Sequence, residues 1–199
     1  MAKIGLFGGT FDPVHLGHLW VAQDAIEQAD LERIIFIPAA QAPLRDDAPA
    51  STGRQRLRML QAAVEGDPRF SVSTEELDRG GTSFTIDTVL NLRPKFPEDE
   101  LFWLLGADQI SRLSQWKSIE QLSAEVTFLG FERRGDAGAE YQIPEGVRLK
   151  MLSRRRCDIS SSEIRERVQK QLPVHLFLSK NVYSIIKNES LYQGNLNLS

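Results

Sequence analysis

Residues 8–18 read Gly8-Gly9-Thr10-Phe11-Asp12-Pro13-Val14-His15-Leu16-Gly17-His18. They follow a short apolar run, Ile4–Phe7, and precede a segment whose apolar residues recur at helical spacing. This order predicts a buried strand, a tight glycine turn and a helix whose opening turn holds two histidines. Glycines let the backbone approach a ligand closely, and the N–H groups of a helix start favour an anion. Histidine adds a donor that can be positively charged near neutral pH. The stretch therefore suits a nucleoside triphosphate.

The chain has 199 residues, of which 41% are hydrophobic and 26% are charged. This length predicts one domain, or one domain with an appendage. The formal net charge of -3 argues against a nucleic-acid-binding surface, for which a basic balance is expected. The single cysteine, Cys157, has no internal partner, which indicates a reducing compartment. Because the sequence shows neither a signal-peptide pattern nor an apolar run of membrane-spanning length, we expect a cytoplasmic protein without a membrane partner.

Apolar runs alternate with amphipathic stretches along the chain. The six strand-like runs are Lys3–Phe7, Arg33–Ile37, Phe70–Thr74, Leu101–Leu105, Val126–Phe131 and Val147–Leu152. This alternation predicts an α/β fold: a Rossmann-like, doubly wound parallel sheet with helices on both faces. We expect a single domain over residues 1–192, with a small C-terminal helical part, and a flexible tail over 193–199. Ligands of such sheets bind beyond the carboxyl ends of the strands, where Gly8–His18, Pro38–Arg45 and Gly106–Asp108 fall.

The segments between the strands divide into predicted helices and predicted loops. Helical spacing of apolar residues covers 16–26, 57–64 and 85–92, and Pro94 ends the third of these. The three segments with loop composition are 39–51, 76–83 and 133–146.

A second group of chemistry-bearing residues is Asp158-Ile159-Ser160-Ser161-Ser162-Glu163-Ile164-Arg165. Ser160 and Glu163 have the spacing of a capping box, so a helix is predicted to start here. A capping role by itself would explain a serine at position 160. The same helix start also offers N–H groups and hydroxyls to phosphate, and Arg165 can make a bidentate contact to a phosphoryl oxygen.

Two further segments combine a chain turn with polar groups. In Leu105-Gly106-Ala107-Asp108, Gly106 permits a close approach and Asp108 can accept hydrogen bonds from a ribose or a base; a plain helix N-cap is the alternative. In Ser83-Phe84-Thr85-Ile86-Asp87-Thr88-Val89, Thr85 begins a helix whose N–H groups would face an anion; a capped surface helix is the alternative.

The histidine-containing stretch resembles the signature of the nucleotidyltransferases named for a His-x-Gly-His tetrad, here His15-Leu16-Gly17-His18. It is neither a Walker loop nor a Gly-x-Gly-x-x-Gly fingerprint. Within that superfamily the chain resembles the bacterial nicotinate mononucleotide adenylyltransferases. Ser83–Thr88 resembles their Ser-Tyr-Thr-x-Asp-Thr, Gly106–Asp108 their Gly-Ala-Asp, and Ile159–Arg165 their Ile-Ser-Ser-Thr-x-Ile-Arg, with Ser162 in place of Thr.

Two places depart from the pattern of this family. Pro43-Leu44-Arg45 stands where the family has Pro-His-Lys, so the charge is kept and the imidazole is lost. Because Arg and Lys are not equivalent at a point-charge site, a phosphate contact by Arg45 competes with a role as a solvated loop cation. Arg133 matches a family Arg, but the following Pro is Arg134 here. The likeness runs from Lys3 to about Tyr192.

The resemblance implies transfer of AMP from ATP to nicotinate mononucleotide in NAD biosynthesis, giving nicotinate adenine dinucleotide and pyrophosphate. Mg²⁺ would accompany ATP, and no protein metal site is expected. The implied catalytic residues are His15, His18 and Arg165. The implied ATP-binding residues are Gly8, Gly9, Thr10, Phe11, His18, Gly106, Asp108, Ser160, Ser161 and Arg165. The implied residues for the second substrate are Asp12, Arg45, Thr85, Trp116, Lys117 and Arg133. Trp116 would stack on the pyridine ring, and a core or surface aromatic is its alternative role.

Two alternatives stay open. The first is a related nucleotidyltransferase with another acceptor, namely phosphopantetheine or nicotinamide mononucleotide; the motif at 83–88 argues against phosphopantetheine. The second is a nucleotide-binding module without catalysis, against which the intact His15, His18, Ser161 and Arg165 argue.

Overall fold

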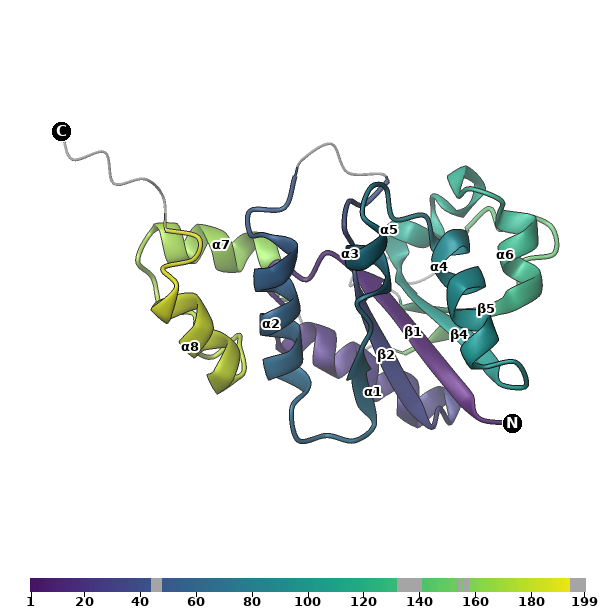
Figure 1. Cartoon of the computed structure of the whole chain (residues 1–199), viewed down its shortest axis with the longest axis horizontal. Helices are drawn as coiled ribbons and strands as arrows, with labels where there is room; N and C mark the ends of the chain where they lie inside the picture. The colour runs from purple at the N-terminus through teal and green to yellow at the C-terminus, as the bar shows by residue number, and fades with distance from the viewer. Residues whose placement is uncertain (44–47, 132–140, 154, 156–157, 194–199) are drawn as a thin grey trace.

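The computed structural model describes residues 1–43, 48–131, 141–153, 155 and 158–193 (Figure 1). Arg45, Arg133 and Cys157 lie outside these ranges, as does the predicted tail from 194 onward. The extent of the domain therefore stays a prediction. Among the described residues, no helix is long and apolar enough to cross a bilayer.

The sheet contains six strands, which match the six predicted runs to within two residues at each end. They are β1 (Lys3–Gly9), β2 (Arg33–Pro38), β3 (Phe70–Val72), β4 (Glu100–Gly106), β5 (Val126–Phe131) and β6 (Leu149–Leu152). Their order is β3-β2-β1-β4-β5-β6, and every neighbouring pair is parallel. This is the strand order of doubly wound dinucleotide folds, so the predicted fold class is confirmed.

Helices follow the strands in chain order. They are α1 (Leu16–Ala29), α2 (Gly53–Val64), α3 (Glu75–Arg79), α4 (Thr85–Leu92), α5 (Ala107–Ile110), α6 (Ile119–Glu125), α7 (Ser161–Gln169) and α8 (Lys180–Asn188), with single 3₁₀ turns at Arg93–Lys95 and Leu113–Gln115. The predicted start of α7 is confirmed, because the Ser160 hydroxyl accepts the Glu163 N–H at 3.1 Å.

The segment 76–83 was expected to be a loop, and this expectation is wrong over its first part. Residues 75–79 form the single-turn helix α3, which ends where Gly80 takes a φ of 67° and donates its N–H to the Glu76 carbonyl at 3.0 Å. A helix of five residues shows too few turns for an apolar period to be visible in the sequence.

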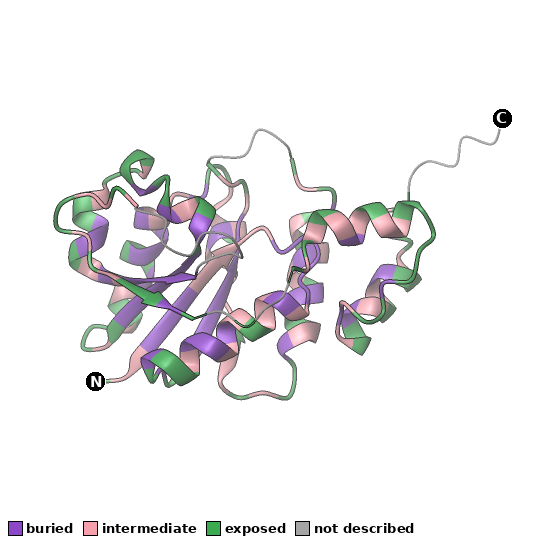
Figure 2. Ribbon diagram, turned by 180° about the vertical axis from the view of Figure 1, so that it is seen from behind, coloured by how far each residue is buried: buried purple, intermediate pink, exposed green. Residues whose placement is uncertain are grey.

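The two faces of the sheet carry separate apolar cores, because alternate residues of a strand point to opposite faces. In β2, Ile34 and Phe36 join one core, and Ile35 and Ile37 join the other. Residues of α1, α2 and α8 complete the first core, and residues of α4, α5 and α6 complete the second. Figure 2 shows the central strands buried between helices whose outer faces are exposed, whereas β6 at the edge of the sheet is largely exposed.

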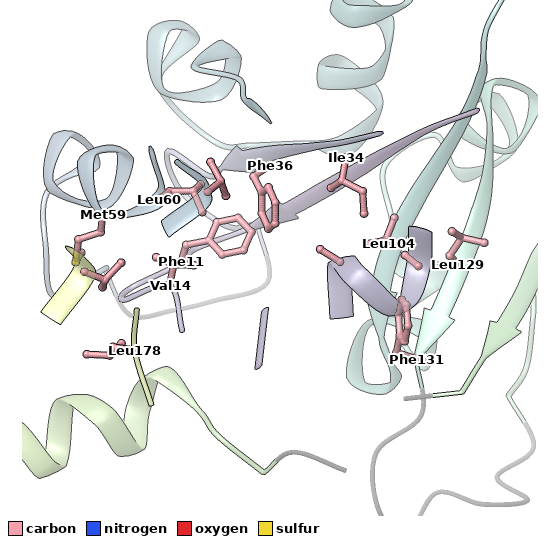
Figure 3. Packing of buried hydrophobic residues seen from close by; sticks show 14 of the residues in the cluster. Phe11, Val14, Ile34, Phe36, Met59, Leu60, Leu104, Leu129, Phe131 and Leu178 are labelled. Atoms are coloured by element: carbon pink, nitrogen blue, oxygen red, sulfur yellow. The ribbon is translucent and has the colours of Figure 1, made fainter. Parts of the chain in front are cut away.

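The C-terminal part packs on the sheet domain through α8, which lies against α2 (Figure 1). The loop before α8 also reaches the start of α1, where the Leu16 N–H donates to the Phe177 carbonyl at 3.0 Å. The first core extends to the histidine-containing stretch, since Phe11 is buried and packs edge-on against Phe36 at 5.8 Å between ring centroids (Figure 3). The turn after β1 is therefore anchored in the core.

Candidate active site

A cleft of about 1010 Å³ lies at the carboxyl ends of β1, β2 and β4. This is the switch point of the sheet, where the chain order of the strands reverses and where ligands of such folds bind. Every predicted site residue that the structure describes lines this cleft. The sequence motifs, spread over residues 8–165, therefore meet in one place.

The two glycines that end β1 are required by close packing of neighbouring aromatic side chains. A Cβ atom on Gly8 would lie 2.5 Å from Trp103, and one on Gly9 would lie 2.9 Å from the ring of Phe11. Phe11 itself has a φ of 51°, a left-handed conformation that costs a non-glycine residue roughly 1–3 kcal/mol. Such strain persists only where the surroundings fix it, and here the buried ring of Phe11 does so.

The two histidines open α1 and contact each other. His15 is the N-cap residue, and its backbone N–H donates to Nδ1 of His18 at 3.2 Å. The ring centroids of the two histidines lie 3.8 Å apart, and the ring of Phe11 packs edge-on against His18 at 5.0 Å between centroids. Because Nδ1 of His18 accepts this hydrogen bond, the imidazole carries its proton on Nε2. The start of α1 therefore carries a ring donor in the lining of the cleft.

The start of α7 docks on the turn after β1. The Ser161 hydroxyl donates to the Pro13 carbonyl at 2.9 Å, and Nη1 of Arg165 donates to the Asp12 carbonyl at 2.7 Å. Nη2 of Arg165 also donates to the Ser162 hydroxyl at 3.2 Å. These bonds use two of the five guanidinium N–H groups, and the side chain lines the cleft. Arg165 is thus oriented and keeps donors for an anion.

Asp12 joins three segments of the chain beneath the cleft. Its buried carboxylate accepts the Ala50 and Ser51 N–H groups at 2.6 and 3.3 Å, the Ser51 hydroxyl, and the Tyr192 hydroxyl at 2.7 Å. Burial raises the pKa of the Tyr192 phenol, which keeps it a donor. These donors occupy both carboxylate oxygens, so the structure gives Asp12 a positioning role; its predicted contact with substrate stays a prediction.

Across the cleft, α4 begins at Thr85 after Phe84. Lys117, predicted to add charge for the substrate, is already engaged: Nζ lies 3.1 and 3.0 Å from the two carboxylate oxygens of Asp87 and 4.6 Å from the Phe84 ring centroid. The predicted contact of Lys117 with the substrate stays a prediction. Trp116 lines the cleft and is also partly buried in the second core, so its predicted stacking stays a prediction.

At the end of β4, Gly106 is both the last strand residue and the N-cap of α5. A Cβ atom built on Gly106 meets no atom within 4 Å, so the backbone there has open space in front of it. Asp108 follows in the first turn of α5 and is exposed at the cleft. The described residues contain no group of three His, Cys, Asp or Glu side chains that could hold a metal ion.

Sequence reasoning missed three buried polar residues around the cleft, Ser51, Arg56 and Glu76, and the partly buried Tyr192. Among them, Glu76 accepts the Thr88 hydroxyl at 2.7 Å and is also hydrogen-bonded by Ser83, whose hydroxyl accepts the Ala40 N–H at 2.9 Å. Glu76 therefore ties α3, the end of β2 and the first turn of α4 together. Burial raises the pKa of its carboxyl, and the hydrogen bonds from Thr88 and Ser83 oppose that shift.

The raised pKa of Glu76 predicts a pH dependence of stability. The folded state holds this proton more tightly than the unfolded chain, whose value is near 4.5. The contribution to the free energy of unfolding is therefore most favourable below that pH and falls as pH rises through the folded pKa. As the pH rises from 4 to 7, the free energy of unfolding of Glu76→Gln should therefore rise relative to that of the parent. Urea unfolding of both proteins across this range checks the trend, and a difference that is flat or falls with pH contradicts it.

The family model of the cytidylyltransferase-like proteins matches residues 6–167. A probable nicotinate-nucleotide adenylyltransferase of Opitutus terrae is 46% identical over 96% of this chain and 98% of its own length. A probable enzyme of the same name from Shouchella clausii is 41% identical over 98% and 99% of the two chains.

The chain belongs to the nicotinate-nucleotide adenylyltransferases of the cytidylyltransferase-like family. A solved structure, a nicotinic acid mononucleotide adenylyltransferase of Plasmodium falciparum complexed with NaAD, shares the fold at a TM-score of 0.74 and 20% identity, covering 96% of this chain and 98% of its own. The His-x-Gly-His tetrad of the family thus occupies the start of α1.

Proposed function

We propose that this chain transfers AMP from ATP to nicotinate mononucleotide and releases pyrophosphate. The observation that supports this most is the convergence of two donor-bearing helix starts on one cleft: α1 with His15 and His18, and α7 with Ser161 and Arg165. Both helix starts favour phosphate, and they stand at the switch point of a dinucleotide-type sheet.

In the proposed reaction, an oxygen of the 5′-phosphate of nicotinate mononucleotide forms a bond to the α-phosphorus of ATP. The bond from that phosphorus to the bridging oxygen breaks, and pyrophosphate leaves with the electron pair. The attacking phosphate is already ionised, so no general base is required. Positioning and stabilisation of charge then carry the catalysis. His18 would donate from Nε2 to a phosphoryl oxygen, and Arg165 would hold the β- and γ-phosphates.

Mg²⁺ bound to ATP would offset the charge of the phosphates in this reaction. Such an ion keeps several waters and is held mainly by the substrate phosphates, so it needs no dedicated cluster of protein ligands. The cytoplasmic location expected from the sequence remains part of the proposal.

A pyrophosphate-release assay with ATP and Mg²⁺ tests the proposed function. The acceptor panel contains nicotinate mononucleotide, nicotinamide mononucleotide and phosphopantetheine. We expect the highest kcat/KM with nicotinate mononucleotide. Faster turnover of another acceptor would assign the chain to that reaction, and ATP binding without pyrophosphate release from any acceptor would indicate a binding module.

Arg165→Ala should weaken ATP binding about tenfold and change AMP binding less than threefold, because AMP lacks the phosphates that the guanidinium is expected to contact. A hydrogen bond to a charged group is worth about 1.5–3 kcal/mol. Calorimetry with both nucleotides measures this. The matched control is Arg167→Ala, since Arg167 stands on the same helix, donates to the Pro173 carbonyl at 3.1 Å and does not line the cleft. Equal losses for ATP and AMP would move Arg165 away from the triphosphate.

A further inference from the structure

Arg56 is a cation buried behind the wall of the cleft. It lies in the first turn of α2, and only 2% of it is exposed. Nη1 donates to the Thr10 carbonyl at 2.9 Å and to the Ala39 carbonyl at 2.7 Å, while Nε finds no acceptor among the described residues. Burial lowers the pKa of the guanidinium, and the negative charge of Asp12 opposes this shift. Burying a cation without a directly paired carboxylate is costly, so its retention needs a reason.

The position of Arg56 relative to the cleft provides that reason. Thr10 and Ala39 line the cleft, whereas Arg56 does not, so one nitrogen holds the turn after β1 and the end of β2 from behind. In a planar trans peptide the carbonyl and the following N–H point in opposite directions. The bond to the Thr10 carbonyl therefore turns the N–H of Phe11 away from Arg56. This is the residue that the turn holds at a left-handed φ of 51°.

The charge of Arg56 matters as much as its geometry. Asp12 places a buried carboxylate in the lining of the same cleft. That negative charge disfavours a polyanion, and in a poorly screened interior the effect reaches the bound phosphates. Arg56 lies close enough to Asp12 for the two charges to interact. Without Arg56, the carboxylate of Asp12 would keep its hydrogen bonds but lose the buried cation that offsets its charge.

We propose that Arg56 is a positioning residue for the phosphate site: it fixes the peptide between Thr10 and Phe11 with its N–H directed to the cleft, and it offsets the charge of Asp12. This inference rests on the proposed function, since it assumes that the cleft takes ATP. It predicts that loss of the buried cation penalises ligands in proportion to their negative charge.

The test compares Arg56→Gln with Arg56→Lys. Both side chains are shorter than Arg and both carry N–H donors, but only Lys keeps the charge. Calorimetry measures the binding of ATP and of uncharged adenosine in the absence of nicotinate mononucleotide. It reports stoichiometry separately from affinity. We expect Arg56→Gln to raise the Kd for ATP at least tenfold and that for adenosine less than threefold, and Arg56→Lys to stay within threefold of the parent for both.

A stability control separates this effect from general loosening of α2. Met59→Ala empties a fully buried position one turn further along the same helix and removes no charge. It should lower Tm while leaving the ratio of ATP to adenosine affinity unchanged. Equal losses of affinity for ATP and adenosine in Arg56→Gln overturn the proposal. A tenfold fall in the ratio of ATP affinity to adenosine affinity in Arg56→Lys also overturns it. The Lys variant alone decides the question if the Gln variant does not fold. Turnover of nicotinate mononucleotide by the parent tests the proposed function independently.

Discussion

Replacing His18 by Ala is expected to lower kcat by about 10²–10³-fold and to change the Kd for ATP far less. Loss of one preorganised donor to charge that develops in the transition state typically costs about 2.7–4 kcal/mol. The ring of His18 stands at the start of α1 with Nδ1 engaged by the His15 N–H, which leaves the Nε2 proton as the donor. Steady-state pyrophosphate release and calorimetric ATP binding measure the two quantities.

His18 also has a structural contact, and a second variant separates it from the catalytic one. Asn at position 18 places Oδ1 where Nδ1 stands, so it can accept the His15 N–H, but it has no group at the position of Nε2. His18→Asn should therefore keep the Tm of the parent and lose kcat as His18→Ala does. His175→Ala is the matched control, because His175 packs against Tyr183 and does not line the cleft. A kcat of His18→Asn within threefold of the parent value would rule out His18 as the catalytic donor.

The fold followed from the sequence because its signals are local. Mostly apolar runs of five or six residues marked the strands, and hydroxyl residues at the right spacing marked helix starts such as Ser160. The parallel order then placed the ends of β1, β2 and β4 at one edge, so the meeting of the motifs in one cleft was predictable from topology.

The polar network behind the cleft was not predictable, because its contacts join residues far apart in the chain. Tyr192 and Asp12 are separated by 180 positions, and nothing in either neighbourhood indicates the pair. Arg56 stands on an amphipathic helix among other charged residues, where an arginine is normally exposed. The ion pair of Lys117 with Asp87 likewise joins residues 30 positions apart. Each assignment needed the tertiary arrangement.

The start of α4 provides a second large effect, on the choice between nicotinate and nicotinamide mononucleotide. Thr85 is the first residue of the helix and lines the cleft, and its N–H meets no acceptor in the described part of the chain. A hydrogen bond from such a donor to a charged carboxylate contributes about 1.5–3 kcal/mol of binding free energy. The amide of nicotinamide instead brings its own donors and carries no charge. The parent should therefore favour nicotinate mononucleotide at least tenfold in kcat/KM.

Thr85→Pro is expected to remove much of that preference. Proline deletes this one N–H and is well tolerated at the first position of a helix. The structure accepts it, because Phe84 has a φ of −77° and a ψ of 128°, an extended conformation that suits a residue before proline. Thr85→Ala, which keeps the N–H and loses the hydroxyl, is the matched control and should retain the preference. The test is to measure kcat/KM with both mononucleotides in the three proteins. Equal use of both substrates by the parent would rule out the backbone N–H as the discriminating group. An equal loss of the nicotinate preference in the Ala and Pro variants would rule it out as well.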